Sequence, residues 1–158
     1  MHTLGSDARR DPAGTPFPTS AGSYVLLIRL RRRLRVAPRS QLIEPGWYAY
    51  CGSARGPGGL RARVARHLRS AKSSHWHIDR LARAGVIRRA YLYDRLTECE
   101  LLGQLRCLAA ASASAPGFGS SDCARCPSHL LGIGTDCAPA DAALQRLGPI
   151  YVYTRAAS

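Results

Sequence analysis

A change of periodicity lies within residues 46–67, which read GWYAYCGSARGPGGLRARVARH. Aromatic residues between glycines over residues 46–52 predict a β-strand, along which side chains point to alternate faces. The alternation places Tyr48 and Tyr50 on one face of this strand, which is therefore aromatic and hydroxylated. An earlier run of branched and aromatic residues, over 24–30, predicts a partner strand, so we expect the two to form an antiparallel hairpin.

The second half of this segment predicts a helix. Glycine and proline fill residues 56–59, which we expect to form a tight loop. Apolar residues then recur at helical spacing, at Leu60, Val64, Leu68 and Ala71. Arg63 and His67 are four residues apart, so they project from a common face of this helix.

The rest of the chain alternates between helical and extended patterns. We expect helices over residues 75–85 and 98–111, the second with Thr97 as its N-cap. Further strands are expected over residues 86–93, 129–134 and 149–154. Together these elements predict an α/β fold with a small, mainly antiparallel sheet and helices packed on its faces.

Length and composition narrow the class of protein. A chain of 158 residues has room for one domain, and 46% hydrophobic residues support a packed core. Arginines interrupt every apolar run, so we expect no membrane span and no membrane partner. Residues 1–20 contain three prolines and lack the apolar core of a signal peptide. We therefore expect a disordered segment over 1–20, one folded domain over 21–155 and a cytoplasmic protein.

The net charge of +13 favours a polyanionic partner. A coding bias toward arginine would raise the total charge, but it would not cluster the basic residues. Residues 55–89 hold nine arginines and one lysine against a single acid, Asp79. This cluster predicts a surface that faces nucleic-acid phosphates. The residues expected to contact nucleic acid are Arg55, Arg61, Arg66, Arg69 and Lys72, together with His75 and His77.

Six cysteines in a chain expected in the cytoplasm indicate thiols or metal ligands in preference to disulfides. Cys123, Cys126 and His129 are separated by two residues each, so they could offer three ligands to zinc. A fourth ligand would come from Cys51, Cys99, Cys107 or Cys137. The alternatives are free buried thiols, or a segment that folds over the face that carries the tyrosines.

Three short motifs follow one another in the chain: Gly22-Ser23-Tyr24, Tyr50-Cys51-Gly52, and L-x-x-R-x-x-x-H over residues 60–67. In this order the sequence resembles the GIY-YIG endonuclease superfamily, which is named after two such strand motifs. The strings HWHID, SDC and SHL are similar to those of its small, single-domain Uri-type branch. The resemblance covers about residues 21–155 and implies a GIY-YIG-like fold with a C-terminal extension.

The resemblance implies a divalent-metal-dependent endonuclease that hydrolyses phosphodiester bonds in DNA. It implies Tyr24 as the general base, Tyr50 as the residue that positions the water or the phosphate, and Arg63 as the ligand of the phosphate oxygens. His67 is the fourth catalytic residue that it implies. A phenol has an ordinary pKa of about 10, so Tyr24 could serve as a base near neutral pH only if positive charge lowers that pKa. Arg63, Arg66 and the metal ion are available for this.

Several carboxylates compete for the metal ion, which we expect to be Mg²⁺ or Mn²⁺. The superfamily places a glutamate on a helix after the third strand, and Glu98 and Glu100 begin such a helix here. Acids at this position also complement the helix dipole. Asp79 and Asp122 are alternative oxygen ligands. No small-molecule cofactor is expected.

The sequence also allows a second class of function, nucleic-acid binding without catalysis. The superfamily has an asparagine near the end of its catalytic module, but this chain contains no asparagine. The alternative is therefore a catalytically impaired scaffold that binds nucleic acid through its arginines. Zinc bound by the cysteines would then stabilise a binding or interaction domain.

Overall fold

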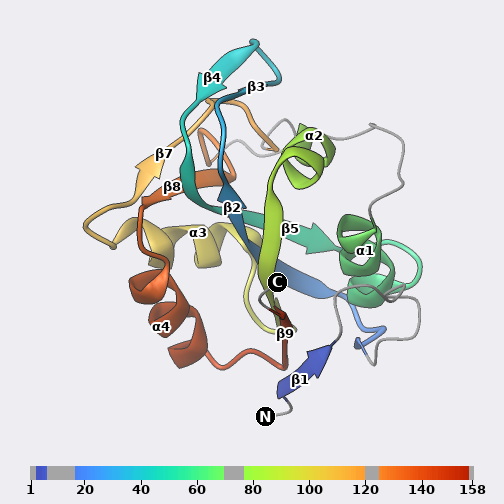
Figure 1. Cartoon of the computed structure of the whole chain (residues 1–158). Coiled ribbons are helices and arrows are strands. Elements are labelled where there is room, and N and C mark those ends of the chain that lie inside the picture. Colours follow the sequence, from blue (N-terminus) through green and yellow to red (C-terminus); the bar gives the residue numbers. More distant parts are fainter. Residues whose placement is uncertain (1–2, 7–16, 70–76, 120–124, 157–158) are drawn as a thin grey trace.

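The structure is a computed structural model of the whole chain, and it describes residues 3–6, 17–69, 77–119 and 125–156. Within these residues a seven-stranded sheet has the order β1-β9-β6-β2-β5-β8-β7 (Figure 1). The strands of this sheet are β1 (Thr3–Ser6), β2 (Gly22–Leu30), β5 (Gly46–Ala54), β6 (Val86–Tyr93), β7 (Ser112–Ala113), β8 (Leu130–Gly134) and β9 (Tyr151–Arg155). Every pair except β1 and β9 is antiparallel. The expected α/β class with a mainly antiparallel sheet is therefore confirmed.

The hairpin predicted from the two aromatic strands is the centre of this sheet. β2 lies between β5 and β6, and it pairs with β5 along the whole length of both strands. The register sets Leu26 opposite Tyr50 and Ile28 opposite Tyr48, so the aromatic residues of β5 share a face with apolar residues of β2. Burial on both faces explains why β2 is almost continuously apolar.

Helices cover both faces of the sheet. α1 (Gly59–Leu68) and α2 (His77–Ala84) bury their apolar residues in the core that contains Tyr24, and we call this side the phenol face. α3 (Glu98–Arg106) and α4 (Ala138–Arg146) pack into the second core, on the opposite face, around Val25 and Leu27. In Figure 1, α1 and α2 lie on the right of the sheet and α3 and α4 on the left. The sheet is thus the middle of three layers.

Several elements differ from the sequence-based expectation. α3 begins at its predicted Thr97 cap with a full capping box, but it ends at Arg106 instead of residue 111. Its buried residues end at Leu105, and helix propensity alone does not extend a helix beyond its packed face. Five elements were not predicted: β1, β7, α4, and the two strands of a separate sheet, β3 (Leu34–Val36) and β4 (Gln41–Ile43).

Parts of the first twenty residues have defined places. β1 pairs in parallel with β9 at the edge of the sheet. Phe17 is buried, and its ring packs edge-on against Tyr151 and Tyr153, with centroids 5.1 and 6.0 Å away. Residues 7–16, which fall within the segment expected to be disordered, lie outside the described residues. Among the described residues, we find no helix with the length and apolar character needed to cross a membrane.

Candidate active site

Two phenols and an imidazole meet on the phenol face. Tyr24 of β2 and Tyr50 of β5 lie with their ring centroids 6.4 Å apart. His67 reaches them from α1, and its Nε2 lies 2.7 Å from the Tyr24 hydroxyl oxygen. Tyr24 is 1% exposed and His67 is 2% exposed, so both side chains are buried. Three of the four residues that the resemblance implies as catalytic therefore form one cluster, which we call the phenol site.

Gly52 explains why the Tyr24 ring can lie across the neighbouring strand. The register sets Gly52 directly opposite Tyr24. A Cβ atom at Gly52 would lie 2.5 Å from the Tyr24 hydroxyl oxygen, far closer than van der Waals contact allows. The absence of a side chain at Gly52 thus leaves room for the Tyr24 hydroxyl to approach His67.

Arg63 and Arg66 line a pocket at the start of α1, and their charges act on Tyr24 of the phenol site. The pocket has a volume of about 220 Å³. Its other lining residues come from the end of β5, the loop that follows it and the start of α1: Ala54, Gly56, Pro57, Gly59 and Ala62. The charges of both arginines oppose the upward shift in the pKa of Tyr24, so their fields reach the buried phenol. Guanidinium groups beside a small open pocket could bind a phosphate group.

Burial determines the protonation state of both phenols. Loss of hydration raises the pKa of Tyr24 well above its ordinary value, and the nearby Tyr50 adds to this rise. Arg63 and Arg66 lower the pKa of Tyr24, but burial outweighs them. Burial likewise raises the pKa of Tyr50 to about 12. In the protein alone the two arginines therefore do not bring the pKa of Tyr24 below its ordinary value, and both phenols are neutral near pH 7.

These raised pKa values predict a loss of stability in alkali. The folded state retains the Tyr24 and Tyr50 protons, while the unfolded chain releases them near pH 10. The stabilisation is therefore fully present below about pH 10 and is lost as the pH rises toward the folded-state pKa values. We expect the free energy of unfolding, measured with guanidinium chloride, to fall from about pH 10 upward. Tyr24→Phe should make this fall less steep, and an unchanged slope would contradict the pKa assignment.

Asp79 forms a buried ion pair with Arg66 and ties α2 to α1. Arg66 Nη1 and Nη2 donate to the two carboxylate oxygens of Asp79 at 2.8 and 2.9 Å. The Asp79 side chain is fully buried, and that of Arg66 is 17% exposed. The sequence offers Asp79 as a metal ligand and Arg66 as a nucleic-acid contact. In the structure both oxygens of this carboxylate bind a guanidinium, which gives the pair a structural role.

The two glutamates of α3 have different surroundings. Glu100 accepts the Thr97 backbone N–H at 2.9 Å as part of the capping box, and its side chain is exposed. Glu98 has a buried Oε2 with no hydrogen-bond partner among the described residues. Burial is the main cause of the raised Tyr50 pKa, and the Glu98 charge is a further one. A buried carboxylate oxygen without a partner is the type of group that a cation would satisfy, so Glu98 fits a metal better than Glu100 does.

The expected nucleic-acid contacts divide into exposed and packed residues. Arg55, Arg61 and Arg69 are exposed. His77 is partly buried and packs on Phe118, with ring centroids 5.7 Å apart. Two further expected contacts, Lys72 and His75, lie outside the described residues.

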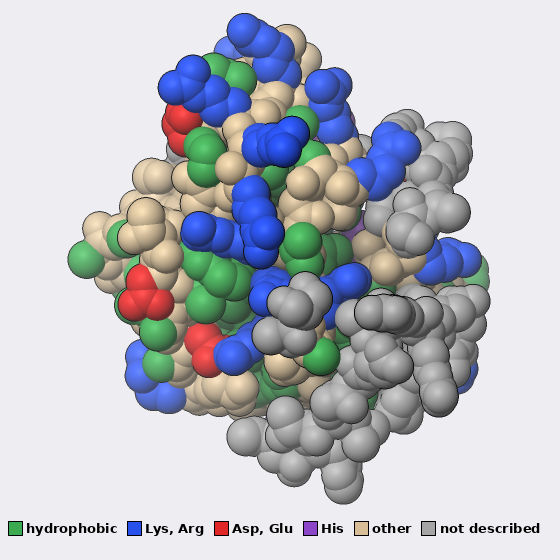
Figure 2. All heavy atoms as spheres, in the orientation of Figure 1, with side chains coloured by type: hydrophobic (Ala, Val, Ile, Leu, Met, Phe, Trp, Pro, Cys, Tyr) green, Lys and Arg blue, Asp and Glu red, His purple; other side chains and the backbone are tan. Residues whose placement is uncertain are grey.

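A second group of basic residues was missed by the sequence-based prediction. The β3–β4 hairpin and its flanks carry exposed arginines at Arg31, Arg32, Arg33, Arg35 and Arg39. Figure 2 shows basic side chains over this hairpin and across the centre of the same view, with few acidic side chains among them. The run of arginines over residues 29–35 was the available signal, but its place in the fold was not predictable.

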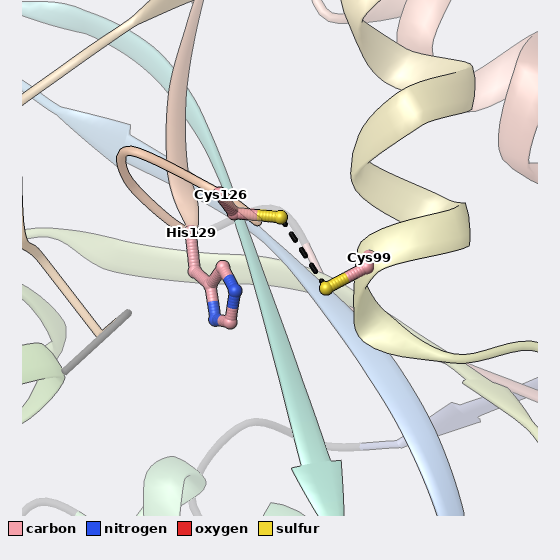
Figure 3. Close-up of side chains that lie close together, drawn as sticks. All are labelled: Cys99, Cys126 and His129. Atoms are coloured by element: carbon pink, nitrogen blue, oxygen red, sulfur yellow. Dashed lines mark hydrogen bonds between the residues drawn. The ribbon is translucent and has the colours of Figure 1, made fainter. Parts of the chain in front are cut away.

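Two thiols and an imidazole form a further cluster, on the opposite face of the sheet. Cys99 projects from α3 toward Cys126 and His129, which precede β8 (Figure 3). One potential ligand atom from each residue lies within 4.8 Å of the other two, so the cluster could hold a metal ion. Cys99 was expected as one of four possible additional ligands. Cys123 and Asp122, which the sequence also offers as ligands, lie outside the described residues.

The segment before β8 also contacts the phenol site. Phe118 packs edge-on against Tyr50, with ring centroids 5.9 Å apart. Gly119 has a φ of +66°, and a Cβ there would lie 2.8 Å from the Tyr50 ring. The sequence left open a segment that folds over the face that carries the tyrosines, but it did not indicate these two residues.

Comparison with known proteins identifies the family but not an activity. No curated protein and no solved structure matches the chain. One family, described as a domain of unknown function, DUF123, matches residues 23–149. The matched residues include Tyr24, Tyr50, Arg63 and His67, together with the thiol and imidazole cluster. The chain therefore belongs to the DUF123 family.

Proposed function

We propose that this protein is a divalent-metal-dependent endonuclease that hydrolyses phosphodiester bonds in DNA, with a GIY-YIG-type site. The observation that supports this most strongly is the phenol site, in which Tyr24, Tyr50 and His67 lie beside an arginine-lined pocket. Residues 21–155 would form the single nuclease domain, with residues 1–20 preceding it.

Arg63 is the residue that we assign to the scissile phosphate. Its guanidinium lines the pocket, and its charge acts on both Tyr24 and Tyr50. A planar guanidinium donates two parallel hydrogen bonds to phosphate oxygens. Negative charge on these oxygens increases as a fifth oxygen approaches phosphorus, so Arg63 would stabilise the transition state more than the bound substrate.

A neutral Tyr24 can act as a base if His67 accepts the phenol proton. A buried phenolate would be costly, because burial raises the pKa of Tyr24. The Tyr24 hydroxyl can instead pass its proton to His67 Nε2, 2.7 Å away, while its oxygen accepts a proton from the attacking water. The phenol stays neutral and the positive charge resides on the imidazole. Tyr50, also neutral, donates a hydrogen bond to the water or to a phosphate oxygen.

Glu98 is the residue that would hold Mg²⁺ or Mn²⁺. α3 packs on the opposite face of the sheet, but the Glu98 charge contributes to the raised pKa of Tyr50, so this carboxylate lies within electrostatic range of the phenol site. Its buried Oε2, which has no hydrogen-bond partner among the described residues, fits a hard cation. When bound, the ion would supply positive charge for the phosphate and lower the pKa of a coordinated water. Asp79 is paired with Arg66, and Glu100 caps α3. Neither residue therefore offers a buried carboxylate oxygen like Oε2 of Glu98.

A nicking assay tests the proposed activity. Purified protein should convert supercoiled plasmid to open circles with Mg²⁺ or Mn²⁺, and it should stop doing so when EDTA is added. Salt-sensitive DNA binding without metal-dependent nicking would refute the nuclease and support the alternative of an impaired scaffold that binds nucleic acid. Two observations favour this alternative: Tyr24 is buried and neutral, and the chain contains no asparagine.

Glu98 and Glu100 offer a matched pair of variants for the metal ligand. Glu98→Gln should raise the Mn²⁺ concentration needed for half-maximal nicking by at least ~10-fold, because an amide is a weaker ligand than a carboxylate. Glu100→Gln keeps a side chain that can complete the capping box, so we expect its metal dependence to match the wild type. Metal titrations of nicking check this, and equal dependence in both variants would contradict the assignment.

A further inference from the structure

The geometry points to a zinc site formed by Cys99, Cys126 and His129, which fastens the segment before β8 to α3. This site shares no residue with the proposed Mg²⁺ or Mn²⁺ site at Glu98, the residue that precedes Cys99 in α3. It is also built from other ligand types, because two sulfurs and an imidazole nitrogen select zinc over hard cations.

The separations of the ligand atoms suit a tetrahedral ion. Bonds of about 2.0 Å to nitrogen and 2.3 Å to sulfur place tetrahedral ligand atoms roughly 3.5–3.8 Å apart. The two sulfurs lie 3.3 Å apart, and the three potential ligand atoms are all within 4.8 Å of one another. A disulfide bond is only about 2.05 Å long, so these sulfurs are spaced as separate thiols. Shifts of up to about an ångström in these side chains would let the three atoms bind one ion, with water or another donor in the fourth position.

The imidazole of His129 supplies independent support. His129 is 5% exposed, and its Nε2 is buried without a hydrogen-bond partner among the described residues. A buried polar nitrogen without a partner costs stability. A zinc ion at the position between Cys99 and Cys126 would satisfy this nitrogen, whereas free thiols would leave it without a strong partner.

The backbone around the ligands shows what such an ion would stabilise. The His129 N–H donates to Phe118 O at 2.9 Å, and the Gly117 N–H donates to Pro127 O. The Cys51 N–H of β5 donates to His129 O at 3.0 Å. The ligand segment therefore pairs with the residues that hold Phe118 against Tyr50. An ion bound on the opposite face would thus fix one wall of the phenol site.

Metal content is the first test. Reduced full-length protein, exposed to zinc and then desalted, should retain about one zinc ion per chain. Cys126→Ser and His129→Gln should each lower this by several fold. Cys107→Ser is the control, because Cys107 is an exposed free thiol outside the cluster, and it should retain as much zinc as the wild type. The proposal is overturned if the reduced wild-type protein holds no zinc, or if Cys126→Ser holds as much as Cys107→Ser.

A second measurement remains decisive if the variants fail to fold. Wild-type protein is first stripped of metal with a chelator. Zinc added at about a hundredfold excess over its dissociation constant should then raise the melting temperature of this stripped protein by roughly 5–10 °C. Replacement by Co²⁺ should give the absorption of a thiolate-to-cobalt charge transfer. A melting temperature that zinc does not raise would overturn the proposal. None of these measurements depends on nicking, so they distinguish a missing zinc site from a missing nuclease activity.

Discussion

Arg63→Ala is expected to reduce metal-dependent nicking of plasmid DNA by about 10²–10³-fold, the effect typical of removing one group that stabilises transition-state charge. The side chain of Arg63 lies partly exposed at the pocket and outside both cores, so its removal should change the free energy of unfolding by less than about 1 kcal/mol. Single-turnover nicking rates and urea unfolding curves measure the two effects separately.

Two further variants show whether the loss of nicking is specific to the Arg63 guanidinium. Arg63→Lys keeps the positive charge but not the planar pair of donors, so it should recover only a small part of the lost rate. Arg146→Ala removes an equal charge from an exposed position on α4, away from the phenol face, and it should nick at the wild-type rate. Equal rates for Arg63→Ala and Arg146→Ala would remove Arg63 from the catalytic residues.

Asp79→Asn is expected to destabilise the protein by about 3–5 kcal/mol, the cost of removing one partner of a buried ion pair. The variant would leave the Arg66 guanidinium, 17% exposed, beside a neutral amide that cannot accept both of its hydrogen bonds. Because this pair ties α2 to α1, we expect the loss to appear as a lower urea midpoint with cooperative unfolding.

An exposed ion pair provides the control for this prediction. Arg33 and Glu44 form a salt bridge at 2.9 Å, but their side chains are 69% and 60% exposed. Glu44→Gln should therefore change the free energy of unfolding by no more than about 1 kcal/mol. If Asp79→Asn were as mild as Glu44→Gln, Asp79 would not be a structural partner of Arg66, and its role as a metal ligand would have to be considered again.

Local pattern was sufficient to predict the centre of the fold. β2 and β5 each extend over nine residues with a consistent arrangement of faces, so their pairing and the shared face of Tyr48 and Tyr50 followed from alternation. α4 was missed because its only buried residues are Ala140 and Leu144, a single helical repeat. β1 and β7 have few residues, and their pairing depends on strands that are distant in the chain.

The candidate site was predictable where it depends on spacing within one element. The four-residue interval between Arg63 and His67 places both toward the phenols, as the helical period requires. The protonation state of Tyr24 was not predictable, because it depends on how fully the helices bury the ring. Cys99 could not be selected among the six cysteines, because the packing of α3 on the sheet brings it to Cys126.

A crystal of the protein soaked with Mn²⁺ and measured at the manganese absorption edge tests the central claim most directly. The proposed function predicts an anomalous peak at the Glu98 carboxylate, on the side toward Tyr50. A peak at Asp79 or Glu100 instead, or full occupancy of the thiol cluster with none at Glu98, would contradict the account of the hydrolytic site.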